Sequence, residues 1–164
     1  MSSRREPLLW IQLLAIGFIP LELILLRLIL AGANLGPIPE IERILTWSIG
    51  VLIPTFSLFK RPADWSSILL FKAPIKGRSK IQLQLSNQQR KLIPLLSLIM
   101  GSFGLLFIFW RVDQSAILAS DFSPLKESSR IISLTISIPI LALILWHWHQ
   151  ISQSIWLLTQ SEET

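Results

Sequence analysis

Four long apolar runs dominate this sequence of 164 residues and restrict the folds that it can adopt. An α-helix rises about 1.5 Å per residue, so about 20 residues cross the hydrocarbon core of a bilayer. The second run reaches this length if its helix begins at Pro39, because proline is favoured in a first helical turn. We therefore predict an all-α, four-helix transmembrane bundle, a single integral membrane domain over residues 1–164 surrounded by the lipid bilayer. The predicted spans are about 7–30, 39–59, 87–110 and 130–150.

The composition agrees with a membrane protein and excludes several kinds of chemistry. Charged residues make up only 15% of the chain, against about 25% in a typical soluble domain. Cysteine is absent, which excludes disulfides, thiol catalysis and iron–sulfur clusters. The net charge of +5 arises from basic residues that flank the apolar runs, so we expect no nucleic-acid partner.

The basic residues also predict an orientation in the membrane. Lysine and arginine accumulate on the cytoplasmic side of membrane proteins. Here they gather before the first run, at Arg4 and Arg5, and in the segment between the second and third runs. We therefore predict cytoplasmic N and C termini and a basic cytoplasmic loop at 60–86.

This loop contains one segment with helical periodicity. Trp65, Ile68, Leu69 and Lys72 fall on one face at positions i, i+3, i+4 and i+7. A tryptophan and a lysine at the two ends of an apolar face favour a short amphipathic helix in the headgroup layer. The alternative is a simple extension of the second transmembrane helix.

Two charged residues, Glu22 and Arg27, lie within the first apolar run. Glu22 would be about 22 Å from the cytoplasmic end of its helix, in the outer half of the bilayer. Arg27 is about 140° around the helix from Glu22, so the two cannot pair, and Arg27 can reach the outer headgroups. Glu22 needs a partner on another helix: a serine, a freed carbonyl or a cation. It is either a packing contact or a proton-coupled or ligand-binding carboxylate.

His147 and His149 are weak candidates for ligands of haem or a pigment. Two positions apart on a helix, they point about 160° from each other and cannot hold one metal ion. The tryptophans beside them are typical of an interfacial anchor. No motif for a phosphate-binding loop, a hydrolase or a metalloprotease occurs. We therefore predict no enzymatic activity, no metal and no bound cofactor.

Small residues and prolines indicate how the helices pack. Ser97 with Gly101, and Ser133 with Ser137, form small-residue pairs that let helices approach closely, within a bundle or in a homodimer. An Ile-Pro dipeptide occurs in every span, and each proline frees the carbonyl four residues earlier. Such breaks are usually tolerated in membrane helices, although transporters use some of them to build ion sites.

Four sequence segments are similar to one cyanobacterial family, the low-complexity tail membrane proteins. The segments are "REPLLWIQL" at 5–13, "PLEL" at 20–23, "FKRP" at 59–62 and "LSNQQRKL" at 85–92. The resemblance covers roughly residues 4–100, and the fourth span matches only as an apolar run. It implies a location in a cyanobacterial thylakoid or plasma membrane, and it supplies no catalytic residues.

These observations lead to three functional hypotheses. The first is a non-enzymatic membrane protein that binds other membrane proteins as an auxiliary or assembly partner of a complex. The alternative is a small proton- or cation-coupled transporter that uses Glu22. A lipid- or pigment-binding module is a third hypothesis.

Overall fold

The computed structural model describes residues 7–31, 35–60 and 92–160. These residues form helices and their connections, with no strand among them. Four helical stretches are long and apolar enough to cross a membrane: Leu9–Leu30, Pro39–Lys60, Leu92–Phe122 and Arg130–Thr159. For the described residues, the prediction of an all-α fold with four helices long and apolar enough to cross a membrane is thereby confirmed. The amphipathic segment with Trp65 lies outside the described residues, and the cytoplasmic placement of the termini stays a prediction.

The first span consists of two helices, α1 (Pro7–Leu13) and α2 (Ala15–Leu30). The break lies at Leu14, whose N–H donates to the Ile11 carbonyl, three residues back, at 3.0 Å. Pro20 lies inside α2 without ending it. The predicted single run at 7–30 therefore contains one break, placed before the proline.

The second span changes its helical type in the middle. It consists of α3 (Pro39–Trp47), the π-helical segment η2 (Ser48–Leu52) and α4 (Ile53–Lys60), so its helix does begin at Pro39. Pro54 has no N–H to give to the Gly50 carbonyl. Immediately before it, the Ile53 N–H donates to the Ser48 carbonyl, five residues back. The wider π turn lies where the proline removes the regular bond.

The last two spans are longer than predicted. Helix α6 (Leu92–Ala116) continues into the 3-10 helix η4 (Ile117–Phe122), whereas a helical end near 110 was predicted. Helix α7 (Arg130–Gln160) extends ten residues past the predicted end at 150. In both helices the added turns carry buried polar side chains, Asp113 in α6 and Gln153 in α7. The polar residues that suggested a helix end are therefore buried inside the bundle.

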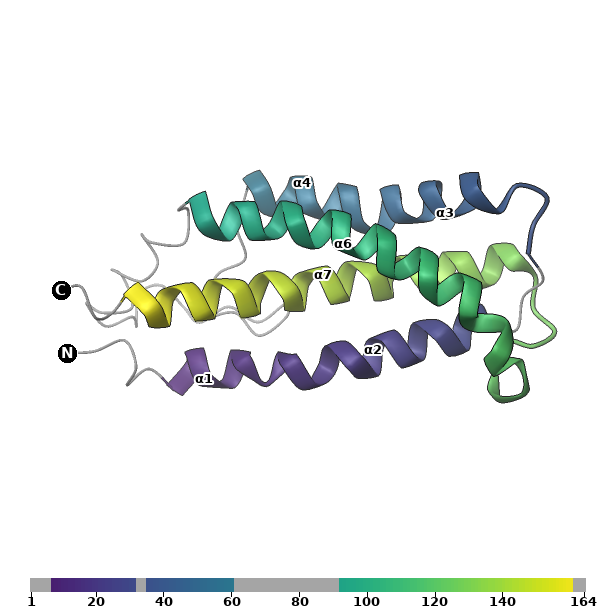
Figure 1. The fold of residues 1–164 in the computed structure, drawn as a ribbon, viewed down its shortest axis with the longest axis horizontal. Coiled ribbons are helices and arrows are strands. Elements are labelled where there is room, and N and C mark those ends of the chain that lie inside the picture. The colour runs from purple at the N-terminus through teal and green to yellow at the C-terminus, as the bar shows by residue number, and fades with distance from the viewer. Residues whose placement is uncertain (1–6, 32–34, 61–91, 161–164) are drawn as a thin grey trace.

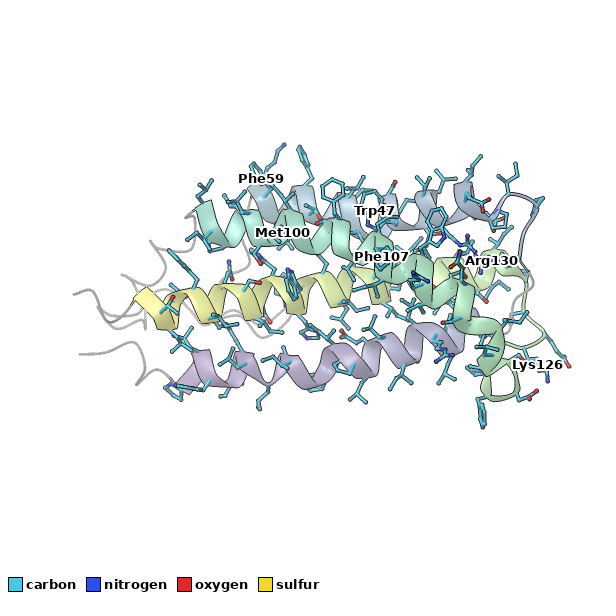
Figure 2. The ribbon with its side chains drawn as sticks, viewed as in Figure 1. Trp47, Phe59, Met100, Phe107, Lys126 and Arg130 are labelled. Atoms are coloured by element: carbon cyan, nitrogen blue, oxygen red, sulfur yellow. The ribbon has the colours of Figure 1, made fainter. Side chains whose placement is uncertain are left out.

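Helix α7 is the centre of the bundle. It runs between α1–α2 on one side and α6 on the other (Figure 1), and it also contacts α3, η2 and α4. α1 starts and α7 ends at the same end of the bundle, which we call the α1 end; α3 and α7 start at the opposite α3 end. Apolar side chains of all four spans form the core, among them Leu26, Val51, Phe109 and Leu141. Others, such as Phe59 and Phe107, point outward (Figure 2), as expected for helices that face lipid.

Candidate functional site

A carboxylate and an imidazole meet inside the bundle. His147 Nδ1 of α7 lies 2.8 Å from Glu22 Oε1 of α2, and the two side chains are 12% and 10% exposed. The ring of Phe18 stacks on the His147 ring, with centroids 5.8 Å apart. Glu22 Oε2 is buried and has no hydrogen-bond partner among the described residues. The partner of Glu22 on another helix is thus His147, a residue that the sequence suggested only as a weak cofactor ligand.

His149 has a different environment from His147. It is fully buried, and its Nε2 lies 3.0 Å from Gln153 Nε2, one turn along α7. The two histidines therefore have separate partners and do not converge. Across the described ranges, no group of three histidine, aspartate or glutamate side chains is placed to hold a metal ion.

The Arg27 side chain of α2 contacts the C-terminal end of α6. Its Nη2 donates to the Ser115 carbonyl at 3.2 Å, in the last turn of α6. Carbonyls at a helix C-terminus have no partner within the helix and carry partial negative charge, so a guanidinium is favourable there. Arg27 thus joins α2 to α6.

A buried ionic cluster closes the α3 end of the bundle, where Figure 2 shows Arg130. Asp113 of α6 accepts from Arg43 of α3 at 2.6 Å and from both terminal nitrogens of Arg130 of α7 at 2.7 and 2.9 Å. Arg130 Nε also contacts Glu42 at 3.2 Å, and the Arg43 guanidinium lies 5.1 Å from the centre of the Trp110 ring. Glu42, Arg43 and Arg130 lie near the starts of predicted spans, and Asp113 lies just beyond the predicted end of the third. Their only signal was that opposite charges occur near the ends of three spans.

The small residues of α6 lie against a tryptophan of α7. Trp148 Nε1 donates to the Ser97 carbonyl at 2.9 Å, and Ser97 Oγ donates to Ser152 Oγ at 2.8 Å. A Cβ on Gly101 would lie only 2.3 Å from Trp148 Cδ1, so this glycine makes room for the indole. Trp148 is therefore a packing contact between α6 and α7.

The serine pair of α7 faces the interior. Ser133 and Ser137 are both fully buried, and the Ser137 hydroxyl donates to the Ser133 carbonyl at 2.7 Å. Close packing recurs next to Ser137: a Cβ on Gly50, in the π segment of the second span, would lie 3.0 Å from the Ile138 carbonyl oxygen. These small residues let the second and fourth spans lie close together. Of the predicted interface residues, only Trp65 lies outside the described part of the chain.

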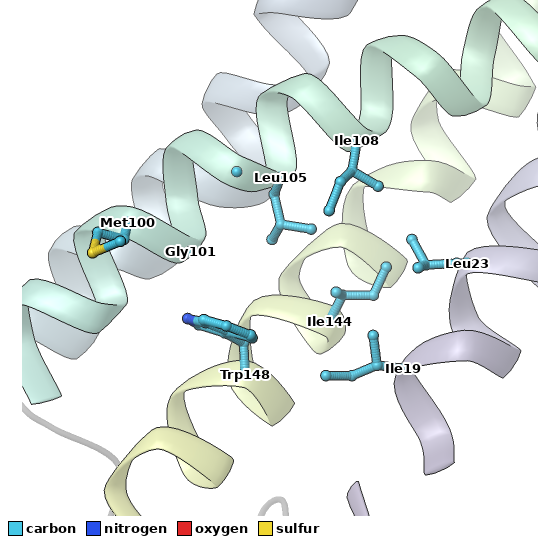
Figure 3. Close-up of a pocket in the computed structure, with 9 residues that line it drawn as sticks. Ile19, Leu23, Met100, Gly101, Leu105, Ile108, Ile144 and Trp148 are labelled. Carbon is cyan, nitrogen blue, oxygen red and sulfur yellow. The ribbon is translucent and has the colours of Figure 1, made fainter. Parts of the chain in front are cut away.

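An apolar groove of about 350 Å³ lies between α2, α6 and α7. Ile19 and Leu23 come from α2, and the Trp148 indole extends from α7 toward α6 (Figure 3). A Cβ on Gly104 would meet no atom within 4 Å, so this part of the groove wall is bare backbone. The full lining is Ile19, Leu23, Met100, Gly101, Gly104, Leu105, Ile108, Ile144 and Trp148.

Four apolar helices, whose polar side chains gather inside the bundle, define the class of this chain as a multi-pass integral membrane protein. A family model described as low-complexity tail membrane protein-like matches residues 5–164. The match covers essentially the whole chain, so the chain belongs to this family. Comparison with curated proteins gives no match, and comparison with solved structures gives none.

Proposed function

We propose that this chain is a non-enzymatic membrane protein that binds a transmembrane helix of another membrane protein, as an auxiliary or assembly partner. The observation that carries the proposal is the groove between α2, α6 and α7. Its apolar lining suits an occupant inside the hydrocarbon core, and Gly101 and Gly104 lie on its α6 wall.

The bare backbone at Gly104 favours a helix over a lipid chain as the occupant. Gly17 of α2 is equally open but lies outside the groove, whereas at Gly104 the bare backbone coincides with an apolar hollow. Small residues on a membrane helix allow a second helix to approach closely, and they are typical of helix–helix contacts. Gly101 already contacts Trp148, so Gly104 is the glycine of this wall that remains open to a partner.

The orientation and location belong to the same proposal. The accumulation of lysine and arginine in the loop at 60–86 and near Arg4 and Arg5 supports cytoplasmic N and C termini. The basic loop would then be a second contact with a partner. The resemblance to cyanobacterial proteins supports a thylakoid or plasma membrane location.

Two matched glycine substitutions test the groove. Gly104→Leu would fill it, whereas Gly17→Leu adds the same side chain to α2 at a position outside it; a Cβ meets no atom within 4 Å at either glycine. We expect the wild type and Gly17→Leu to co-purify with a larger complex from native membranes in mild detergent. Gly104→Leu should purify alone, with unchanged helicity by circular dichroism.

Other results would contradict the proposal. A wild-type particle that purifies alone after gentle solubilisation would refute it, and so would full retention of the complex by Gly104→Leu. A complex of exactly two copies, measured by native mass spectrometry and lost in Gly104→Leu, would replace the proposed partner with a homodimer. If only a lipid or a pigment occupied the groove, that molecule would be found in an organic extract of the purified protein.

The second candidate function is a small proton- or cation-coupled transporter that uses Glu22. The pairing of Glu22 with His147 favours it. Ionisable side chains inside a membrane bundle are energetically costly and commonly mark the path of an ion or a substrate. The groove argues for the first candidate, since its lining is apolar and Glu22 is not among its residues. Proton-driven uptake of the lipophilic cation tetraphenylphosphonium into proteoliposomes tests transport. Uptake that is abolished in Glu22→Gln would support it, and equal uptake would dismiss it.

A further inference from the structure

A line of buried polar side chains extends from Glu22 and His147 toward the α1 end of the bundle, where Leu9 and Leu157 form a small apolar cluster. Gln12 of α1 is 5% exposed, Gln150 of α7 is 5% exposed and Ser154 of α7 is fully buried. The Ser154 hydroxyl donates to Gln12 Oε1 at 2.5 Å, which joins α1 to α7. We call Gln12, Gln150 and Ser154 the polar seam.

The seam and the Glu22–His147 pair lie on the same helix faces. His147, Gln150 and Ser154 stand at positions i, i+3 and i+7 of α7, which is one face of the helix. By helix rise, Ser154 is about 10 Å from His147 along the axis. On the opposite helix, the small and buried Ala15 lies between Gln12 and Glu22. Phe18, whose ring stacks on His147, is the nearest apolar side chain on this path.

Toward the α3 end, the two turns of α7 next to the pair have no buried polar side chain on this face. The same face of α7 continues toward the α3 end with Leu143 and Ile140. On α2 the neighbouring buried residues toward that end are Leu26 and Leu30. Near the pair, buried polar side chains are therefore found toward the α1 end, whereas the two turns toward the α3 end have none on this face.

We propose that Glu22 and His147 form a proton-binding site that exchanges protons with water only at the α1 end, through the polar seam. The proton comes from bulk water, binds the unpartnered Glu22 Oε2 and returns to the same water on release. A buried polar seam can hold water that carries the proton, whereas the apolar turns toward the α3 end cannot. This inference does not depend on the groove or on a partner helix.

Few other ionisable side chains lie on the described helices around Glu22 and His147. His147 is the ionisable side chain in contact with Glu22. On α2, Arg27 donates to the Ser115 carbonyl, and on α7, His149 lies beside Gln153. α1 carries no ionisable side chain, and neither does α6 from Leu92 to Trp110. Among the described residues, Glu22 and His147 are therefore the two ionisable side chains that meet at this site.

The absence of cysteine makes the chain a ready background for an accessibility test. Gln150→Cys and Ser154→Cys place a thiol in the seam, and Leu143→Cys and Ile140→Cys are matched controls on the same face toward the α3 end. Each variant is reconstituted in oriented vesicles and treated with a membrane-impermeant methanethiosulfonate from one side at a time. This reagent requires a thiolate, which forms in water and is suppressed in an apolar environment.

We expect Gln150→Cys and Ser154→Cys to be modified from the α1 side, at least tenfold faster than Leu143→Cys and Ile140→Cys. Equal rates on both parts of the face, or faster modification from the α3 side, would overturn the proposal. A measurement on the unaltered chain guards against misfolded variants. Infrared titration of the wild type should show a protonated-carboxyl band that is missing in Glu22→Gln and that responds only to pH on the α1 side. A wild type without this band, or with a response from the α3 side, would equally overturn it.

Discussion

The buried ionic cluster at the α3 end gives the sharpest stability prediction. Asp113 is 4% exposed and neutralises two arginines from two other helices, Arg43 and Arg130. Asp113→Ala removes all three of its hydrogen bonds in one step. Arg43, itself only 3% exposed, would then lie in the bundle without a close carboxylate.

The expected loss follows from what remains after the substitution. Removing one partner of a buried ion pair typically costs about 3–5 kcal/mol, because the other charge stays buried and unpaired. Arg130 would keep Glu42 at 3.2 Å, whereas Arg43 would keep only the exposed Glu40 at 3.8 Å. We therefore expect Asp113→Ala to lower the free energy of unfolding by about 3 kcal/mol, near the lower limit of that range.

The free energy of unfolding can be measured by SDS titration in mixed micelles, followed by circular dichroism. The matched control is Asp121→Ala, because the Asp121 carboxylate contacts Lys126 at 3.2 Å with both side chains largely exposed. An exposed pair of this kind contributes about 0–1 kcal/mol. A loss for Asp113→Ala no larger than that of the control would refute the reasoning.

Two further stability predictions follow from single contacts between α6 and its neighbours. Gly101→Leu should lower the free energy of unfolding by about 1–3 kcal/mol, because the Trp148 indole already occupies the space of the new side chain. Gly104→Leu should leave the free energy of unfolding unchanged, because a Cβ there meets no atom within 4 Å. Trp47→Phe should lose about 1 kcal/mol, because the Trp47 Nε1–H donates to the Ser102 carbonyl at 3.0 Å inside the bundle. The same SDS titration measures both, and a reversed order of the two glycine variants would contradict the packing described for the groove wall.

The four spans could be predicted from hydropathy because the bilayer requires a minimum helix length and satisfied backbone groups. The start of the second span at Pro39 was predictable for a local reason, the preference of proline for a first turn. The extension of α6 was not, since Asp113 looks like a residue of a polar connection until its two arginines are found. Those arginines are far away in the sequence, and only the packing of three helices brings them together.

The candidate site was predictable in part. Glu22 stands out in the sequence because a carboxylate within a span needs a partner, but its pairing with His147 depends on the axial and rotational positions of α2 and α7. The spacing of His147, Gln150 and Ser154 did carry a usable signal, a polar stripe at helical period in a run that otherwise looks like a fading span. The groove had no sequence signal beyond its two glycines, because its shape depends on how α6 crosses α7.

The proposed binding of a partner helix can be tested most directly in the native membrane. Met100, an exposed residue at the groove, is replaced by the photo-crosslinking residue p-benzoylphenylalanine, and the exposed Phe107 of the same helix is replaced in the same way as the control outside the groove. On illumination we predict a covalent adduct with one membrane protein from position 100, and none with that protein from position 107. Adducts with lipid alone at position 100, or the same protein adduct at equal yield from both positions, would contradict the proposed function.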